Sequence, residues 1–220
     1  MTFFVDTNIP LGYTIIHDKF HDPSKNFIED NEDIFWSNLV KKEYTEKLDA
    51  LIDDIEIFLK IAENELKENM KDFPSYYTFE KYVLKRTKRC SLNKTKKQKI
   101  LTHFWDKYNI IEGISEPLYL NFKNFNKNFK KMYLKRDKEL HTILKLHNCG
   151  IDNYKKYYGY AKQLYEWGVH KPDCKIITDA HDCGLTHEGL TFVSNDAEML
   201  EIIINHSTSF LKIMEFKSCT

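Results

Sequence analysis

The sequence lacks the glycine and cysteine patterns that build common nucleotide and metal sites. Only 7 of its 220 residues are glycine, and they form neither a GxGxxG fingerprint nor a GxxxxGK[ST] loop, which argues against Rossmann dinucleotide sites and P-loops. The 5 cysteines are scattered and include no CxxC pair, so neither a zinc ribbon nor a disulfide scaffold is expected. This use of cysteine favours a reducing compartment, and we expect the protein to be cytoplasmic.

Long apolar runs are also missing. No stretch reaches the roughly 18 consecutive apolar residues that a transmembrane helix needs. The first residues carry neither the basic segment nor the small-residue cleavage site of a signal peptide. We therefore expect no membrane association. Apolar residues nevertheless make up 42% of the chain, which is enough for a folded core and excludes a wholly disordered protein.

Charge is unevenly distributed along the chain although the total is balanced at 33 basic and 33 acidic residues. Between residues 81 and 138, 17 Lys and Arg stand against 4 Asp and Glu, which leaves 16 basic and 29 acidic residues elsewhere. A block with this excess of positive charge can bind phosphates. Lysines on a solvated helix face would give the same count, so charge alone leaves both readings open.

Short apolar runs and helical periodicity alternate at both ends of the chain. The runs predict strands at 2–5, 33–37, 190–193 and 210–214. Ser37 is placed to cap the helix that follows the second run. Apolar residues at three- and four-residue spacing predict helices over the segments 48–62, 118–149, 154–165, 173–183 and 197–204. Alternating strands and helices predict a three-layer α/β/α protein with a central parallel sheet.

Aromatic side chains are frequent in the basic middle of the chain. Three phenylalanines recur at helical spacing and are expected in a core: Phe122, Phe125 and Phe129. Four rings lie among lysines and arginines: Tyr76, Tyr77, Phe79 and Tyr82. Such rings can stack on unpaired bases or pack the segment's own helices, and the sequence does not decide between the two.

Four acidic residues stand where a parallel sheet gathers ligands. Asp6 and Asp196 each end a predicted strand, Glu43 lies near a helix start, and Asp173 lies on the apolar face of a helix. Strand carboxyl ends and the helix starts that follow them share one edge of the sheet, so these carboxylates can converge there. Converging carboxylates must take up protons or bind a cation, and oxygen ligands suit Mg²⁺ or Mn²⁺. Each acid can also be explained by a structural role alone, as a residue that favours a turn, as a negative charge in the first turn of a helix, or as a helix N-cap.

The segments that carry these acids resemble the PIN domain family of metal-dependent nucleases. The matching segments are Val5-Asp6-Thr7-Asn8 and the segments 36–43, 172–180 and 192–196, in the family's order. The resemblance implies an endoribonuclease that uses Mg²⁺ or Mn²⁺ through Asp6, Glu43, Asp173 and Asp196. It implies supporting roles for Asn8 and Ser194. Asp179 is either a further acid of the site or a solvated residue, and we expect the solvated position.

The resemblance covers residues 1–66 and 147–220, and the long middle of the chain departs from it. Residues 67–146 are therefore expected to be a basic helical insertion in a PIN-like nuclease core. We expect RNA as the partner and expect its phosphates to be held by the cluster Lys85, Arg86, Lys88 and Arg89. A protein partner such as an antitoxin, and a homodimer, are left open.

Other functions fit parts of the same pattern. A non-catalytic RNA-binding or scaffold protein would keep the fold without the reaction, and a flap-type DNA nuclease would share the acidic edge. A phosphatase of the haloacid dehalogenase type fits poorly, because Asn8 stands where that chemistry uses a second aspartate.

Overall fold

The structure is a computed structural model that describes residues 1–150, 152–206 and 208–219. The chain divides into two compact units. We call Met1–Lys47 with Arg136–Thr220 the sheet unit and Leu48–Lys135 the helical unit. The boundaries between the units, at 47/48 and 135/136, differ from the boundaries at 66/67 and 146/147 expected from the sequence. Each boundary between the units lies inside a long helix, the first in α3 (Asn38–Asn69) and the second in α6 (Ser115–Ile143), where no change in the sequence pattern marks it.

The sheet unit is built on five parallel strands in the order β3-β2-β1-β4-β5. The strands are β1 (Thr2–Val5), β2 (Asp33–Ser37), β3 (Lys145–His147), β4 (Thr191–Val193) and β5 (Glu215–Lys217). The central strand is fully enclosed, and Phe4 and Val5 have no exposed surface. An α/β fold with an all-parallel sheet is thus confirmed, as are the predicted strands β1, β2 and β4.

Two edge strands differ from the sequence prediction. The predicted strand at 210–214 is wrong, because Leu211 and Ile213 fill the core from a segment of turns and the strand follows as β5. The helix predicted to run to Cys149-Gly150 ends at Ile143, and β3 follows it. Both strands have only three residues and no buried residue, so neither carries the apolar run by which strands were predicted.

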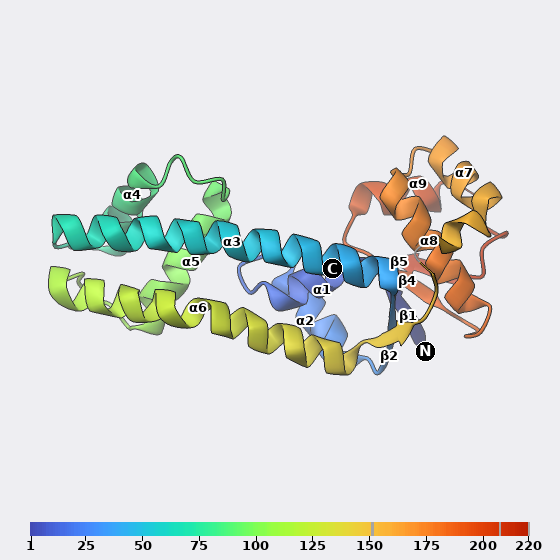
Figure 1. Cartoon of the computed structure of the whole chain (residues 1–220), viewed down its shortest axis with the longest axis horizontal. Coiled ribbons are helices and arrows are strands. Elements are labelled where there is room, and N and C mark those ends of the chain that lie inside the picture. The colour runs from blue at the N-terminus through green and yellow to red at the C-terminus, as the bar shows by residue number, and fades with distance from the viewer. Residues whose placement is uncertain (151, 207, 220) are drawn as a thin grey trace. The chain divides into compact units, whose positions relative to one another are not determined.

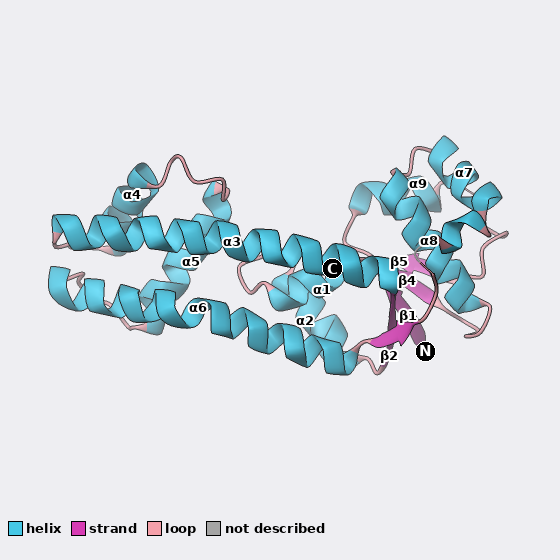
Figure 2. Ribbon diagram, viewed as in Figure 1, coloured by secondary structure: helices cyan, strands magenta, loops and turns pink. Residues whose placement is uncertain are grey.

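Helices cover both faces of the sheet in an arrangement consistent with three layers. In Figures 1 and 2, α1 (Asn8–Thr14) and α2 (His21–Asp30) lie on one side of the strands. The other side carries α7 (Tyr158–Glu166), α8 (Lys171–Gly184) and α9 (Ala197–Ile204), with the short 3₁₀ turn η1 (Asn153–Lys155) before them. Parallel strands that are covered in this way are buried on both faces.

Local sequence signals set the starts and faces of two helices that carry predicted acids. The Ser37 hydroxyl accepts a hydrogen bond of 3.2 Å from the Val40 amide, so the predicted cap of α3 is confirmed. In α8 the apolar residues Ile177, Ala180 and Cys183 have no exposed surface, and the helix packs against β2. This face directs the start of α8 toward the sheet.

The helical unit contains α4 (Tyr76–Arg86), α5 (Lys94–Lys107) and the adjoining parts of α3 and α6. Its core is aromatic, with the Phe104 ring centroid 4.9 Å from that of Phe122 and 5.7 Å from that of Phe79. The predicted burial of the three α6 phenylalanines is confirmed. Phe79 is wholly buried, whereas Tyr77 is 67% exposed. No helix in the described residues combines the length and apolar character that crossing a bilayer requires.

Candidate functional site

Asp6 is the centre of a hydrogen-bonded cluster at the carboxyl end of β1. Its side chain is 5% exposed and accepts three hydrogen bonds. The Thr7 amide donates to Oδ1 at 2.6 Å, and both the Asn8 side-chain amide (2.7 Å) and the Ser194 hydroxyl (2.8 Å) donate to Oδ2. The structure therefore places the two expected supporting residues directly on Asp6.

The same side chains join the end of β1 to the turn after β4. The Asn8 side-chain oxygen accepts a hydrogen bond of 2.8 Å from the backbone amide of Asn195. This bond orients the Asn8 side-chain nitrogen toward Asp6. The Ser194 oxygen accepts from the Asp196 amide at 3.1 Å. A closed network of this kind holds each member in one orientation.

Glu43 reaches the cluster through Thr7. The Thr7 hydroxyl donates to Glu43 Oε2 at 3.1 Å, and the Lys47 ammonium lies 2.5 Å from Oε1 one helical turn further along α3. Residue 7 therefore holds two of the predicted acids at once, through its amide on Asp6 and its hydroxyl on Glu43. No pattern in the sequence distinguishes Thr7 from the other polar residues of the turn after β1.

Two of the four predicted acids, Asp6 and Asp173, have pKa values raised by burial and by the charges of neighbouring acids. The pKa of Asp6 is raised to about 7, mainly by burial; the Ser194 hydrogen bond opposes the rise, and the charges of Asp173 and Glu43 add to it. Burial also raises the pKa of Asp173, with the charges of Asp196 and Glu43 adding to the effect. Burial and the neighbouring negative charges thus act in the same direction on both carboxyl groups.

The donor set fits a hard divalent cation, although the side chains are not gathered around one point. Among the described residues, no three His, Cys, Asp or Glu side chains are grouped so that they could hold an ion. The chemistry nevertheless suits Mg²⁺ or Mn²⁺, because oxygen ligands are the type these ions prefer. Positive charge between the carboxylates would oppose the like-charge effects that add to the raised pKa values of Asp6 and Asp173. An ion would have to draw these side chains closer together than they lie here.

Asp196 also has a structural role as a helix cap. Its Oδ1 accepts a hydrogen bond of 3.0 Å from the Met199 amide, which makes it the N-cap of α9. The residue is half-buried, and its charge still acts on Asp173. Capping and membership of the acidic group are thus compatible at this position.

Asp179 lies in a different environment from the one expected. It is only 2% exposed, so the expectation of a solvated side chain is wrong. Its Oδ1 accepts a hydrogen bond of 3.1 Å from the side-chain amide of Asn153, whereas its buried Oδ2 has no hydrogen-bond partner in the described residues. Burial raises its pKa, and hydrogen bonds from Ser37, Asn153 and Cys149 oppose the rise. The segment around η1 covers this face of α8, which helical periodicity alone does not show.

A hollow of about 940 Å³ opens beside the acidic group, with Asn8 and Asp196 in its lining. Lys19, Phe20 and Lys217 line it as well, and the Lys19 ammonium lies 4.3 Å from the centroid of the Phe20 ring. Positive charge and an aromatic face therefore stand next to the carboxylates. No motif or periodicity in the sequence distinguishes these residues. The adjacent Lys19-Phe20 pair was the available signal, while Lys217 belongs to the unpredicted strand β5.

The predicted RNA-binding cluster is divided in the structure. Lys85 and Lys88 line a pocket of the helical unit. Arg86 instead pairs with Glu65, Nε to Oε2 at 3.6 Å, and its guanidinium lies 5.4 Å from the Tyr82 ring centroid. Arg89 is exposed. These four side chains therefore do not share one set of contacts.

Comparisons with family models, with curated proteins and with solved structures found no match to this chain. The class established here is an α/β protein with a five-stranded all-parallel sheet. An account of its function has to be built from the chain's own residues.

Proposed function

We propose that the sheet unit is the core of a metal-dependent nuclease of the PIN type that hydrolyses phosphodiester bonds in RNA. The observation that carries this proposal is the electrostatic coupling of Asp6, Glu43, Asp173 and Asp196 at the carboxyl end of the sheet. These are the four acids that the family resemblance selects, and they come from four separate segments of the chain. A purely structural explanation would require four unrelated turn or cap residues to place their charges where they act on the two buried acids, Asp6 and Asp173.

The residues around the acids act as positioning groups in this proposal. Asn8 and Ser194 orient Asp6, since each donates a hydrogen bond to its Oδ2, and the Ser194 bond opposes the rise in the pKa of Asp6. The Thr7 hydroxyl positions Glu43 by a hydrogen bond. When bound among these carboxylates, Mg²⁺ or Mn²⁺ supplies positive charge to a phosphate oxygen and makes an attacking water more acidic.

The hollow next to Asn8 and Asp196 supports a single-stranded substrate. Lys19 and Lys217 supply positive charge for backbone phosphates, and Phe20 supplies a ring on which a base can stack. These positive charges are needed close to the acids, because the negatively charged carboxylates repel a phosphate backbone when no cation is bound.

A second candidate function is binding of RNA without cleavage. The observation in its favour is that the carboxylates are already engaged by the protein's own donors, with Asp6 accepting three hydrogen bonds and Asp196 capping α9. A flap-type DNA nuclease is the corresponding alternative for substrate, because oxygen-ligand metal chemistry does not itself distinguish RNA from DNA.

The test is cleavage of matched RNA and DNA oligonucleotides in Mg²⁺, in Mn²⁺ and in EDTA. We expect RNA to be cut in both metals and to stay intact in EDTA. Asp173→Asn removes one acid of the group and should lower the rate by at least about 100-fold, the scale of losing one important electrostatic group. Asp30→Asn removes an exposed charge on α2 and should leave the rate unchanged. Binding of RNA without cleavage in either metal would favour the second candidate, and cleavage confined to DNA would favour the third.

A further inference from the structure

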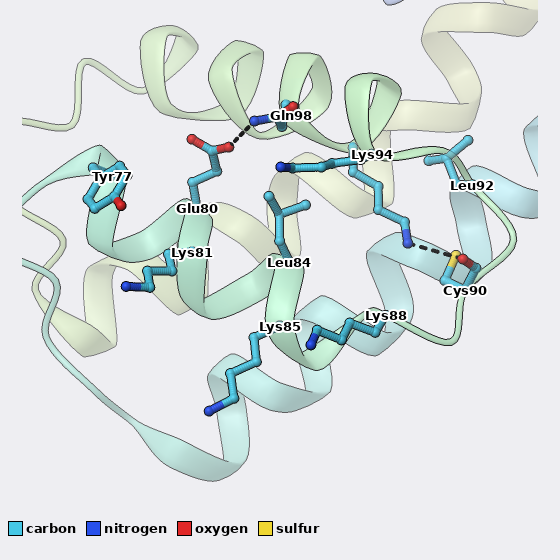
Figure 3. Close-up of a pocket in the computed structure, with 11 residues that line it drawn as sticks. Tyr77, Glu80, Lys81, Leu84, Lys85, Lys88, Cys90, Leu92, Lys94 and Gln98 are labelled. Carbon is cyan, nitrogen blue, oxygen red and sulfur yellow. Dashed lines mark hydrogen bonds between the residues drawn. The ribbon is translucent and has the colours of Figure 1, made fainter.

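The helical unit contains a basic pocket that the proposed nuclease does not use. The pocket has a volume of about 770 Å³, and every residue that lines it lies between positions 77 and 98 (Figure 3). It is formed by α4, by α5 and by the loop between them. All its lining residues therefore belong to one compact unit.

Lysine dominates the lining of this pocket. Four exposed lysines contribute to it: Lys81, Lys85, Lys88 and Lys94. The one acidic residue, Glu80, is hydrogen-bonded to the Gln98 amide, and Figure 3 shows these two side chains facing each other. Leu84 and Leu92 give the pocket an apolar part. The result is a concave surface with a large excess of positive charge, which is the arrangement that concentrates anions.

A buried lysine fixes the shape of the pocket. Lys97 is 5% exposed, and its ammonium donates to the carbonyl oxygens of Thr87 at 2.8 Å and of Cys90 at 3.1 Å. Asn93 then caps α5 by accepting from the Lys96 amide at 2.8 Å. The loop between α4 and α5 is thereby held at both ends. A pocket that is formed in advance loses less conformational entropy when a ligand binds.

We propose that this pocket binds a nucleotide that carries a diphosphate or triphosphate group. Four exposed lysines line this one cavity, and their combined charge matches the three or four negative charges of such a chain better than the one or two of a single phosphate. Lysine binds phosphate as a point charge with three donors, which suits a flexible phosphate chain. Tyr77, 67% exposed at the rim, offers a ring face for the base.

Two sources present this chemistry: a free nucleoside triphosphate and the 5′-triphosphate end of an RNA. We would titrate the full chain calorimetrically with ATP, AMP and inorganic tripolyphosphate in EDTA. We expect ATP to bind at least about tenfold more tightly than either of the others. Two RNA oligonucleotides of one sequence, with a 5′-triphosphate or a 5′-hydroxyl, would then compete with ATP. Displacement by the triphosphate RNA alone assigns the pocket to RNA ends, and displacement by neither assigns it to free nucleotides.

Matched variants separate the pocket from general electrostatic attraction. Lys85→Gln with Lys88→Gln should weaken ATP binding at least about tenfold. Lys123→Gln with Lys127→Gln removes the same charge from exposed positions on α6 and should change binding less than about twofold. Lys94→Gln tests the pocket from α5 if the first pair perturbs α4, as read from circular dichroism.

Three results would overturn the proposal: no binding of ATP, equal binding of ATP and tripolyphosphate, or an equal effect of the two double variants. The titration contains no divalent ion and no cleavage step. Failure of the proposed nuclease would therefore leave this result unaffected, and the converse also holds.

Discussion

The Ser194 hydroxyl donates a hydrogen bond of 2.8 Å to the Asp6 carboxylate, although 188 residues separate the two in sequence. This bond joins the carboxyl ends of the neighbouring strands β1 and β4. It also stabilises a charge that burial disfavours, since it is the largest of the effects that lower the pKa of Asp6. The two residues therefore connect the stability of the sheet with the charge state of the candidate site.

Ser194→Ala is expected to destabilise the protein by about 1.5–3 kcal/mol, the usual contribution of a hydrogen bond to a charged group. The loss should be greatest above pH 7, where Asp6 is ionised, because the variant leaves that charge with one donor fewer. Urea unfolding at pH 8 measures the change. A double-mutant cycle with Asp6→Asn isolates the pair, and additive effects would show that the bond contributes nothing.

Asp6→Asn is expected to change how stability depends on pH. The pKa of Asp6 is about 7 in the folded protein and 3.8 ordinarily, so between these values the unfolded chain binds fewer protons than the native state. The contribution of Asp6 to stability is therefore fully present below about pH 4 and declines as the pH rises to about 7. The variant lacks this decline, and its melting temperature in EDTA should rise relative to wild type from pH 4 to pH 8.

Asp30→Asn is the control for that experiment, because it removes an exposed carboxylate of the same unit. It should show the wild-type pH profile. If Asp6→Asn also follows the wild-type profile, the side chain does not titrate differently in the folded and unfolded states, and the electrostatic argument for the site fails.

Mn²⁺ is expected to bind among the four carboxylates and to stabilise the native state. Melting temperature should rise with Mn²⁺ concentration in the wild type and rise much less in Asp173→Asn, because only the folded chain assembles the ligands. Anomalous scattering from crystals soaked in Mn²⁺ should show one or two ions, with oxygen ligands at about 2.0–2.2 Å if the site is magnesium-like. Ions bound only elsewhere would contradict the assignment.

Lys19→Gln with Lys217→Gln is expected to weaken binding of single-stranded RNA in EDTA. If each lysine contacts one phosphate, the dependence of log K on log salt should become shallower by about 0.7 per lysine. Lys25→Gln with Lys42→Gln removes two exposed lysines that pair with glutamates on their own helices and should leave the slope unchanged. Equal slopes in all proteins would show that the hollow does not hold the backbone.

The strands of this fold could be predicted where burial leaves a pattern in the sequence. β1, β2 and β4 contain runs of apolar and aromatic residues because they lie inside the sheet. β3 and β5 are three-residue edge strands with no buried residue, and their pairing depends on where the rest of the chain places them. Long-range placement of that kind leaves no local periodicity to detect.

Some residues of the candidate site could be predicted from the sequence and others could not. Asp6 could be selected because strand ends in a parallel sheet share an edge, and the family resemblance selected Asn8 and Ser194; the structure joins the three by hydrogen bonds. The burial of Asp179 could not be predicted, since it depends on the segment that carries Asn153, 26 residues away. The hollow lined by Lys19 and Lys217 could not be predicted either, because Lys217 belongs to β5 and the sequence pattern predicted that strand at 210–214.

The strand order has a consequence for how the protein is made. β1 leaves the ribosome early but keeps one edge unpaired until β4 has been synthesised, because its second neighbour is β4. Ser194 follows Asp6 by 188 residues, which is about 10–40 s at ordinary rates of translation. For most of this interval the nascent chain carries Asp6 and Glu43 but lacks Asp173 and Asp196, so it cannot assemble the acidic group. The acidic group can therefore form only after Asp196, the last of its four members along the chain, has been synthesised.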